Sequence, residues 1–260
     1  MTYGIMAADQ IQSSVTGVSI GPGNATNFKN RIINGAMVID QRNAGASVTP
    51  ADGLVYTLDR WATQTSVASK LSVQQNAGSV TPPAGFINYA GLTSTSAYSV
   101  GTNDYFTYIQ RIESYNIADL AWGTANAKTV TLSFWVRSSL TGTFGGSLRN
   151  GSYNRSYPFS YTISSANTWE QKTITIPGDT TGTWTTSGQT TFGVEINISL
   201  GCGSTQSSPA GAWVGTSALT CTGATSVVGT NGATLYVTGV QLEVGSIASG
   251  FEVRDYGREL

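Results

Sequence analysis

Short segments in which apolar and polar residues alternate constrain the fold of this chain more than any other feature. Two segments show the alternation most clearly, residues 128–139 ("KTVTLSFWVRSS") and residues 190–201 ("TTFGVEINISLG"). Successive side chains of a β-strand point to opposite faces, so each segment predicts a strand with one apolar face. The predicted core residues are Val130, Leu132, Phe134 and Val136 in the first segment, and Phe192, Val194, Ile196, Ile198 and Leu200 in the second.

Further segments of the same kind are separated by turn residues. They are "LDRWATQTS", "YFTYIQRIES", "EQKTITIPGD" and "ATLYVTGVQLEVGS", the last interrupted at Gly239, where we expect a β-bulge. Only "NIADLAWG", about residues 116–122, predicts a helical turn. Many short strands with regular turns and few helices predict an all-β chain, folded as an antiparallel β-sandwich or jelly roll.

The first part of the chain lacks this alternation. Residues 1–29 are small, polar and broken by Gly-Pro-Gly, which indicates either a flexible tail or an extended arm that orders on a partner. The following segment, "NRIINGAMVIDQRN" at residues 30–43, is interpreted as the first strand of the sandwich. Ile33, the Asn34-Gly35 step and Met37 would lead it into the core.

Composition excludes several classes of protein. Charged residues make up 10% of the chain and the net charge is −1, without a basic cluster, which argues against nucleic-acid binding. The absence of histidine excludes Ser-His-Asp and Cys-His hydrolases and histidine-bound zinc. No apolar stretch is long enough to span a membrane, and the N-terminus does not look like a signal peptide.

The two cysteines, Cys202 and Cys221, flank a stretch rich in glycine, serine and threonine. Two cysteines cannot complete a four-ligand zinc site. Two alternatives stay open: a pair of free buried thiols, or one disulfide that closes a surface excursion between two strands.

Several landmarks follow one another along the chain: "INGAM", "DRW", "VTLSFWVRSS", "NTWEQKTITIPGD" and "LYVTGVQLEVGS". In this order they resemble the jelly-roll carbohydrate-binding modules of cellulases and xylanases, which have a galactose-binding-domain-like fold. The resemblance implies a sugar-binding jelly roll.

A second resemblance covers nearly the whole chain, and its most specific part is the ending "VQLEVGSIASGFEVRDYGREL". Together with "NRIINGAMVIDQRN", "QRIES" and "TWEQKTITIPGDTTGTW", this ending is similar to bacteriophage tail-fibre and other virion surface proteins. The resemblance implies a virion surface protein that is assembled in the host cytoplasm and exposed outside the cell. It also implies a homo-oligomer, specifically a trimer. The implied division is an N-terminal arm (1–29) for virion attachment or subunit contact, a jelly-roll domain (30–250) and a C-terminal tail (251–260).

The chain departs from the sugar-binding modules at their structural calcium site. Where those modules carry carboxylates, this sequence has Val38 and Thr238 or Gly239, which supply none. Calcium prefers carboxylate and carbonyl oxygens, so we predict no metal and no other cofactor.

Candidate carbohydrate contacts are aromatic side chains that can stack on a sugar ring, and polar side chains that can bond its hydroxyls. On strands, outside the predicted core faces, these are Trp135, Arg137, Glu195, Asn197 and Tyr108. In loops they are Tyr153, Tyr157, Trp184 and Trp213. If their strands are neighbours, Trp135, Arg137 and Asn197 would form one patch; otherwise Trp135 is covered by a second layer or a subunit contact.

Three functions follow from these observations. The first is a tail-fibre-like or receptor-binding virion protein that recognises a host surface glycan. The second is a structural capsid decoration or head-fibre protein, docked by its arm to other virion proteins. The third, a glycan-degrading enzyme, needs two carboxylates about 5 to 10 Å apart. Since no motif among the 14 acidic residues indicates such a pair, we expect no enzymatic activity and no catalytic residues.

Overall fold

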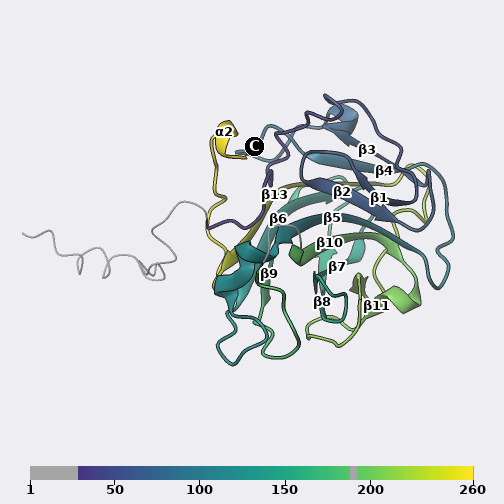
Figure 1. Cartoon of the computed structure of the whole chain (residues 1–260). Helices are drawn as coiled ribbons and strands as arrows, with labels where there is room; N and C mark the ends of the chain where they lie inside the picture. Colours follow the sequence, from purple (N-terminus) through teal and green to yellow (C-terminus); the bar gives the residue numbers. More distant parts are fainter. Residues whose placement is uncertain (1–28, 188–191, 260) are drawn as a thin grey trace, which may run out of the picture.

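The structure, a computed structural model, describes residues 29–187 and 192–259, and it is a sandwich of two antiparallel sheets (Figure 1). The larger sheet has the strand order β1-β2-β5-β10-β7-β8. Its strands are β1 (Gly53–Tyr56), β2 (Trp61–Thr65), β5 (Tyr105–Glu113), β10 (Phe192–Cys202), β7 (Gly142–Asn150) and β8 (Ser156–Ile163). The predicted all-β class is confirmed.

The smaller sheet has the order β3-β4-β13-β6-β9. Its strands are β3 (Leu71–Gln75), β4 (Ala90–Ser94), β13 (Thr234–Val244), β6 (Val130–Ser138) and β9 (Glu170–Ile176). The short parallel strands β11 (Ser207–Ser208) and β12 (Thr220–Cys221) belong to an excursion after β10. The helical elements are η1 (Ala77–Ser79), η2 (Ser114–Leu120), η3 (Ser204–Gln206) and α2 (Tyr256–Glu259), and no helix among the described residues is long and apolar enough to cross a membrane.

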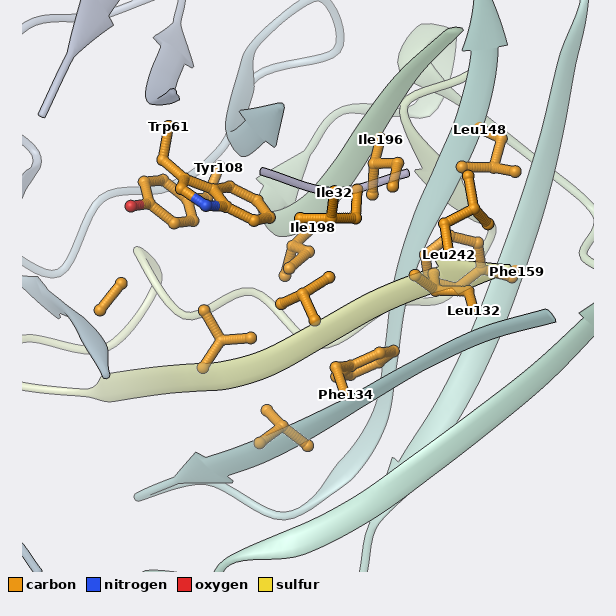
Figure 2. Packing of buried hydrophobic residues seen from close by; sticks show 14 of the residues in the cluster. Ile32, Trp61, Tyr108, Leu132, Phe134, Leu148, Phe159, Ile196, Ile198 and Leu242 are labelled. Carbon is orange, nitrogen blue, oxygen red and sulfur yellow. The ribbon is translucent and has the colours of Figure 1, made fainter. Parts of the chain in front are cut away.

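The core lies between the two sheets and consists of the apolar faces that the alternation predicted. Leu132 and Phe134 of β6 face Ile196 and Ile198 of β10 across it (Figure 2). Trp61 and Tyr108 stack with their ring centroids 5.1 Å apart and an interplanar angle of 14°. Burying a large apolar side chain stabilises a fold by about 1.5–3 kcal/mol, so this layer holds the sheets together.

The prediction that Phe192 faces the core is wrong, because this residue lies on the outer face of the six-stranded sheet. The register of β10 against β5 shifts between Phe192 and Val194, which places two residues of β10 opposite one of β5. Such a bulge reverses the phase of the alternation. Phe192 therefore packs outside the core against Tyr153 and Arg111, while Val194 and the residues after it keep their predicted face.

Two local predictions are confirmed. Gly239 in β13 has φ +62°, and the register against β6 shifts between Thr238 and Gln241, as expected of a bulge. The predicted helical turn is present as the 3₁₀ helix η2, two residues earlier than the pattern indicated.

The prediction of a first strand at residues 30–43 is wrong. The segment is irregular because Asn34 and Met37 have φ of 55° and 59°, which no strand accommodates. Met37 is nevertheless fully buried, as expected. Side-chain amides add to the backbone bonds that Arg31 N and Gly35 O make with β13: the Asn30 amide accepts from Leu242 N and donates to Val240 O, and the Asn34 amide accepts from Ile39 N.

The chain's end fastens this opening segment to the sandwich. Glu252 accepts a hydrogen bond from Asn30 N at 2.8 Å, and Arg254 donates to Asn30 O. Glu259 of α2 accepts from Asn34 N at 3.1 Å. The C-terminal segment is thus bonded to the domain at Glu252, Arg254 and Glu259, while the predicted arm lies outside the described residues apart from Lys29.

Gly35 provides a test of this docking. A Cβ atom at Gly35 would lie 2.2 Å from the Val240 carbonyl oxygen, which is backbone and cannot move aside. We expect Gly35→Ala to destabilise the fold by about 1–3 kcal/mol, as overpacked sites do. The matched control is Gly215→Ala, whose Cβ would meet nothing within 4 Å. Denaturant unfolding measures both variants, and equal midpoints would contradict the docking described.

Candidate functional site

A buried carboxylate lies at the centre of the outer face of the six-stranded sheet. Glu195 of β10 is fully buried and is held by two arginines from the neighbouring strands. Arg111 Nε of β5 donates to Glu195 Oε2 at 2.8 Å, and Arg149 Nε of β7 donates to Oε1 at 2.6 Å. The three residues are opposite one another in register, so strand pairing brings them together. Because the carboxylate has two guanidinium partners, this Arg-Glu-Arg network carries one excess positive charge.

Arg149 is fixed from every side. It is 5% exposed and also donates to Gln64 Oε1 of β2 at 2.8 Å and to Ser217 Oγ at 3.0 Å. Its guanidinium lies 4.2 Å from the centre of the Tyr153 ring. A guanidinium that donates hydrogen bonds in its own plane and stacks on an aromatic ring has little conformational freedom. Arg149 is therefore a rigid part of the site.

Arg111 is the part of the network that solvent reaches, with 26% of its side chain exposed. Its Nη2 donates to the Tyr153 hydroxyl at 3.0 Å, and its guanidinium lies 4.5 Å from the centre of the Phe192 ring. Burial would lower the pKa of Arg111, but the hydrogen bond and charge of Glu195 outweigh this and raise the pKa. The Tyr56 hydroxyl is close enough to contribute to the same rise. The guanidinium is therefore charged at every physiological pH.

Two exposed tyrosines lie on the same face of the sheet as this arginine, and Tyr56 has the Arg42 guanidinium 5.3 Å from its ring centre. Tyr153 follows β7 and is 39% exposed, and Tyr56 of β1 is 43% exposed. The turn that carries Tyr153 is fixed by Asn150, whose side chain accepts from Asn154 N and Arg155 N. The arrangement thus offers aromatic rings and charged hydrogen-bond donors on a rigid sheet, the combination that stacks on a sugar ring and bonds its hydroxyls.

The excursion between Cys202 and Cys221 covers the other part of this face. A Cβ on Gly145 of β7 would lie 2.5 Å from Thr220 Oγ1, so the excursion lies directly on the sheet. Beneath it Asn197 is fully buried, and neither atom of its amide has a hydrogen-bond partner among the described residues. The neighbouring Ser147 hydroxyl has none either. Asn197 therefore lies beside the network but is not exposed.

Trp135 and Arg137 lie elsewhere, so the predicted patch with Asn197 does not exist. Both belong to β6, in the other sheet, and face away from the core on the opposite side of the sandwich. Arg137 donates to Asn167 O at 2.9 Å and lies 5.5 Å from the centre of the Tyr236 ring. Alternation predicts the face of a strand, whereas the sheet to which a strand belongs depends on long-range pairing.

Tyr108 is a core residue and not a surface candidate. It is fully buried against Trp61, and burial raises its pKa far above the usual range. In β5 the odd-numbered residues share the outer face with Arg111. Tyr108 is even-numbered and therefore faces the core, so its prediction as a surface residue is wrong.

Three candidates predicted in loops, Tyr157, Trp184 and Trp213, pack with Trp122 in one aromatic cluster, and Tyr157 lies on β8 and not in a loop. Trp213 lies between 5.2 and 5.3 Å, centroid to centroid, from each of the other three rings. The indole of Trp184 donates to Asp179 Oδ2 at 3.1 Å and that of Trp213 to Pro177 O at 2.7 Å. The rings cover one another, so they form an extension of the core.

The disulfide alternative is not formed, because both cysteines are free thiols. Cys202 Sγ lies 3.5 Å from Ser199 Oγ, whereas Cys221 Sγ lies 3.9 Å from Phe144 O. Burial raises the pKa of both thiols, which keeps them protonated and unreactive. The predicted surface excursion between them is present.

Sequence reasoning found Glu195 and Tyr153 but missed Tyr56, Gln64, Arg111, Arg149 and Phe192. Arg111 and Arg149 carried a signal, since Arg149 is the one charged residue of β7 and Arg111 shares β5 with a single other charged residue, Glu113. Their common partner depends on the strand order, which the sequence does not state. No group of three or more acidic or cysteine side chains that could hold a metal occurs among the residues described.

No family model matches the sequence, and no curated protein matches it either. Several solved structures are similar in fold. A putative sugar binding protein from Bacteroides thetaiotaomicron has a TM-score of 0.48 at 10% identity, over 83% of this chain and 100% of that one. A family 11 carbohydrate-binding module from Clostridium thermocellum, in complex with a β-1,3-1,4-mixed-linked tetrasaccharide, has a TM-score of 0.34 at 11% identity, over 78% and 96%.

The enzymatically active domain of tailspike protein 4 from bacteriophage CBA120 is also similar, with a TM-score of 0.38 at 13% identity. The match covers 84% of this chain but only 22% of the tailspike chain. These similarities concern the fold alone, and the site must be judged by its own side chains.

Removing the central carboxylate should unfold the site. Glu195→Gln would leave Arg149 buried without its counter-charge, and breaking a buried pair in this way costs about 3–5 kcal/mol. The control is Arg42→Gln, which removes the ion pair between Arg42 Nε and Asp59 Oδ1, 3.9 Å apart at the surface. Its loss should lower the free energy of unfolding by less than about 1 kcal/mol. Thermal unfolding compares the two, and similar losses would show that Glu195 does not organise this face.

The aromatic cluster predicts a pH dependence. Burial alone would raise the pKa of Asp179, but hydrogen bonds from Arg155, Thr181 and Trp184 outweigh it and lower the pKa. The ionised form therefore stabilises the fold fully above the unfolded-state pKa, about 3.9. This stability is lost as the pH falls through the lower folded-state value.

Asp179→Asn, which lacks this ionisation, should be less stable than the wild type at neutral pH. The difference in Tm should shrink as the pH falls below about 4. Tryptophan fluorescence follows both proteins, because Trp184 contacts Asp179 directly. A difference in Tm that stays constant down to about pH 2 would refute the coupling.

Proposed function

We propose that this chain is a non-catalytic carbohydrate-binding domain of a bacteriophage virion surface protein, which recognises a host surface glycan in the manner of a tail fibre. The glycan would lie on the outer face of the six-stranded sheet, over Tyr56, Arg111 and Tyr153. The observation that carries the proposal is the partly exposed guanidinium of Arg111, which is bonded to the exposed Tyr153 and anchored on a buried network.

The chemistry of these side chains supports a sugar ligand. A tyrosine ring stacks on the C–H face of a pyranose, and its hydroxyl donates or accepts a further bond. A guanidinium presents several donors in one plane, which suits neighbouring sugar hydroxyls or a carboxylate. Because Glu195 and Tyr153 hold Arg111 in place, binding costs little side-chain entropy.

The absence of catalysis is part of the proposal. Glu195 is the acid at the centre of the face, and both of its oxygens are bound to guanidinium groups. A general acid must carry a proton, and a nucleophile must reach the substrate. A carboxylate held in this way does neither, so glycans incubated with the protein should be recovered uncleaved.

Assignment to a virion rests on the resemblance of the sequence, above all of its ending, to phage surface proteins. We propose that the domain assembles as a homotrimer and that residues 1–29 attach it to other virion proteins. In this role the glycan-binding face would be exposed outside the cell.

A glycan array and adsorption to host cells test the binding. Tyr153→Ala and Arg111→Ala should each weaken binding at least tenfold, because they remove a stacking ring and the charged donor. Tyr115→Ala is the matched control, since Tyr115 is 71% exposed in η2, beyond the end of β5. Circular dichroism establishes that each variant is folded.

Two results would contradict the proposal. One is the absence of any bound glycan or cell, combined with many regularly spaced copies on the capsid, which would favour a capsid decoration protein. The other is binding that Tyr153→Ala and Arg111→Ala leave unchanged.

A further inference from the structure

A cleft of about 330 Å³ opens on the outer face of the five-stranded sheet, on the opposite side of the sandwich from the Arg-Glu-Arg network. Its floor is formed by Ser133 and Trp135 of β6 and Gln171 of β9. Trp135 and Gln171 are direct partners in the pairing of these strands, so an indole and an amide lie side by side.

Two phenylalanines from distant parts of the chain form the walls. Phe86, from the loop between β3 and β4, and Phe251, from the C-terminal segment, meet edge to face with their centroids 5.1 Å apart. Phe86 rests on the bulge in β13, where a Cβ at Gly239 would lie 2.5 Å from its ring. The glycine is therefore required both for the bulge and for the position of this wall.

The wall that carries Phe251 is fixed by buried groups of β13. Glu243 accepts hydrogen bonds from Ser249 N at 2.8 Å and Ser249 Oγ at 2.6 Å. Gln241 accepts from Glu252 N at 2.8 Å. These bonds lie on both sides of Phe251 in the chain, so the cleft is formed in advance of any ligand.

The lining determines the class of ligand. All ten lining residues are uncharged. Ser133 is 3% exposed yet lines the cleft. Aromatic rings beside a few polar groups are typical of sites for small organic ligands, and the volume is near the lower end of their range of about 300–1,000 Å³.

From these features we infer a second carbohydrate site, which takes a single neutral sugar residue, such as the end of a glycan chain. The ring would stack on Trp135, while the Gln171 amide and the Ser133 hydroxyl bond its hydroxyl groups. This site shares no residue with the face proposed above, and it does not depend on that proposal.

Calorimetric titration with methyl glycosides of glucose, galactose, mannose and N-acetylglucosamine tests the inference, with glucuronic acid as a charged comparison. At least one neutral sugar should bind with a Kd on the order of 1 mM, typical of a small ligand with few contacts. Trp135→Ala should weaken it at least tenfold. Gln171→Ala, at an exposed position that folding tolerates, should weaken it about fivefold, or roughly 1 kcal/mol.

Tyr153→Ala separates the two sites, since it should leave this affinity unchanged. Three outcomes would overturn the inference. They are no binding of any neutral sugar, loss of binding in Tyr153→Ala but not in Trp135→Ala, and equal affinity for glucuronic acid. Failure here leaves the glycan-array test of the other face unaffected, because the two tests use different variants.

Discussion

The ion pairs of Glu195 are the interaction on which the six-stranded sheet depends. A carboxylate with no exposed surface is stable only when charged partners replace the water that it loses. Arg111 and Arg149 provide them from the two strands that flank β10, so three neighbouring strands are tied in one register. The same bonds orient Arg111. They also orient Tyr153, because Tyr153 contacts both arginines. Fold stability and the proposed glycan recognition thus rest on one network.

How much the sequence predicts depends on the range of the interaction. Alternation in residues 128–139 and 194–200 identified core faces correctly, because burial of one face is a local property of a strand. It failed at Phe192, where one extra residue in a bulge reversed the phase. It also failed in the opening segment, which forms no strand. There the side-chain amides of Asn30 and Asn34 accept hydrogen bonds from the backbone N–H groups of Leu242 and Ile39. The site itself depends on which strands are neighbours, and no local pattern encodes that order.

The two outer faces of the sandwich differ in chemistry. The six-stranded sheet presents a charged arginine bonded to an exposed tyrosine, whereas the cleft of the five-stranded sheet is lined by uncharged and aromatic residues. Their positions on opposite sides mean that one short glycan cannot occupy both. In an oligomer on a virion, repeated weak sites of either kind would act together, since multivalency raises avidity by about 10²–10⁴ without new contacts.

The central claim is that a glycan binds on the outer face of the six-stranded sheet, over Tyr56, Arg111 and Tyr153. A crystal structure of the chain with a glycan selected by the array tests it most directly. The account predicts a sugar ring stacked on one of the two tyrosines, with a hydroxyl or carboxylate bonded to the Arg111 guanidinium. A glycan that binds in solution but contacts none of these three side chains in the crystal would contradict it.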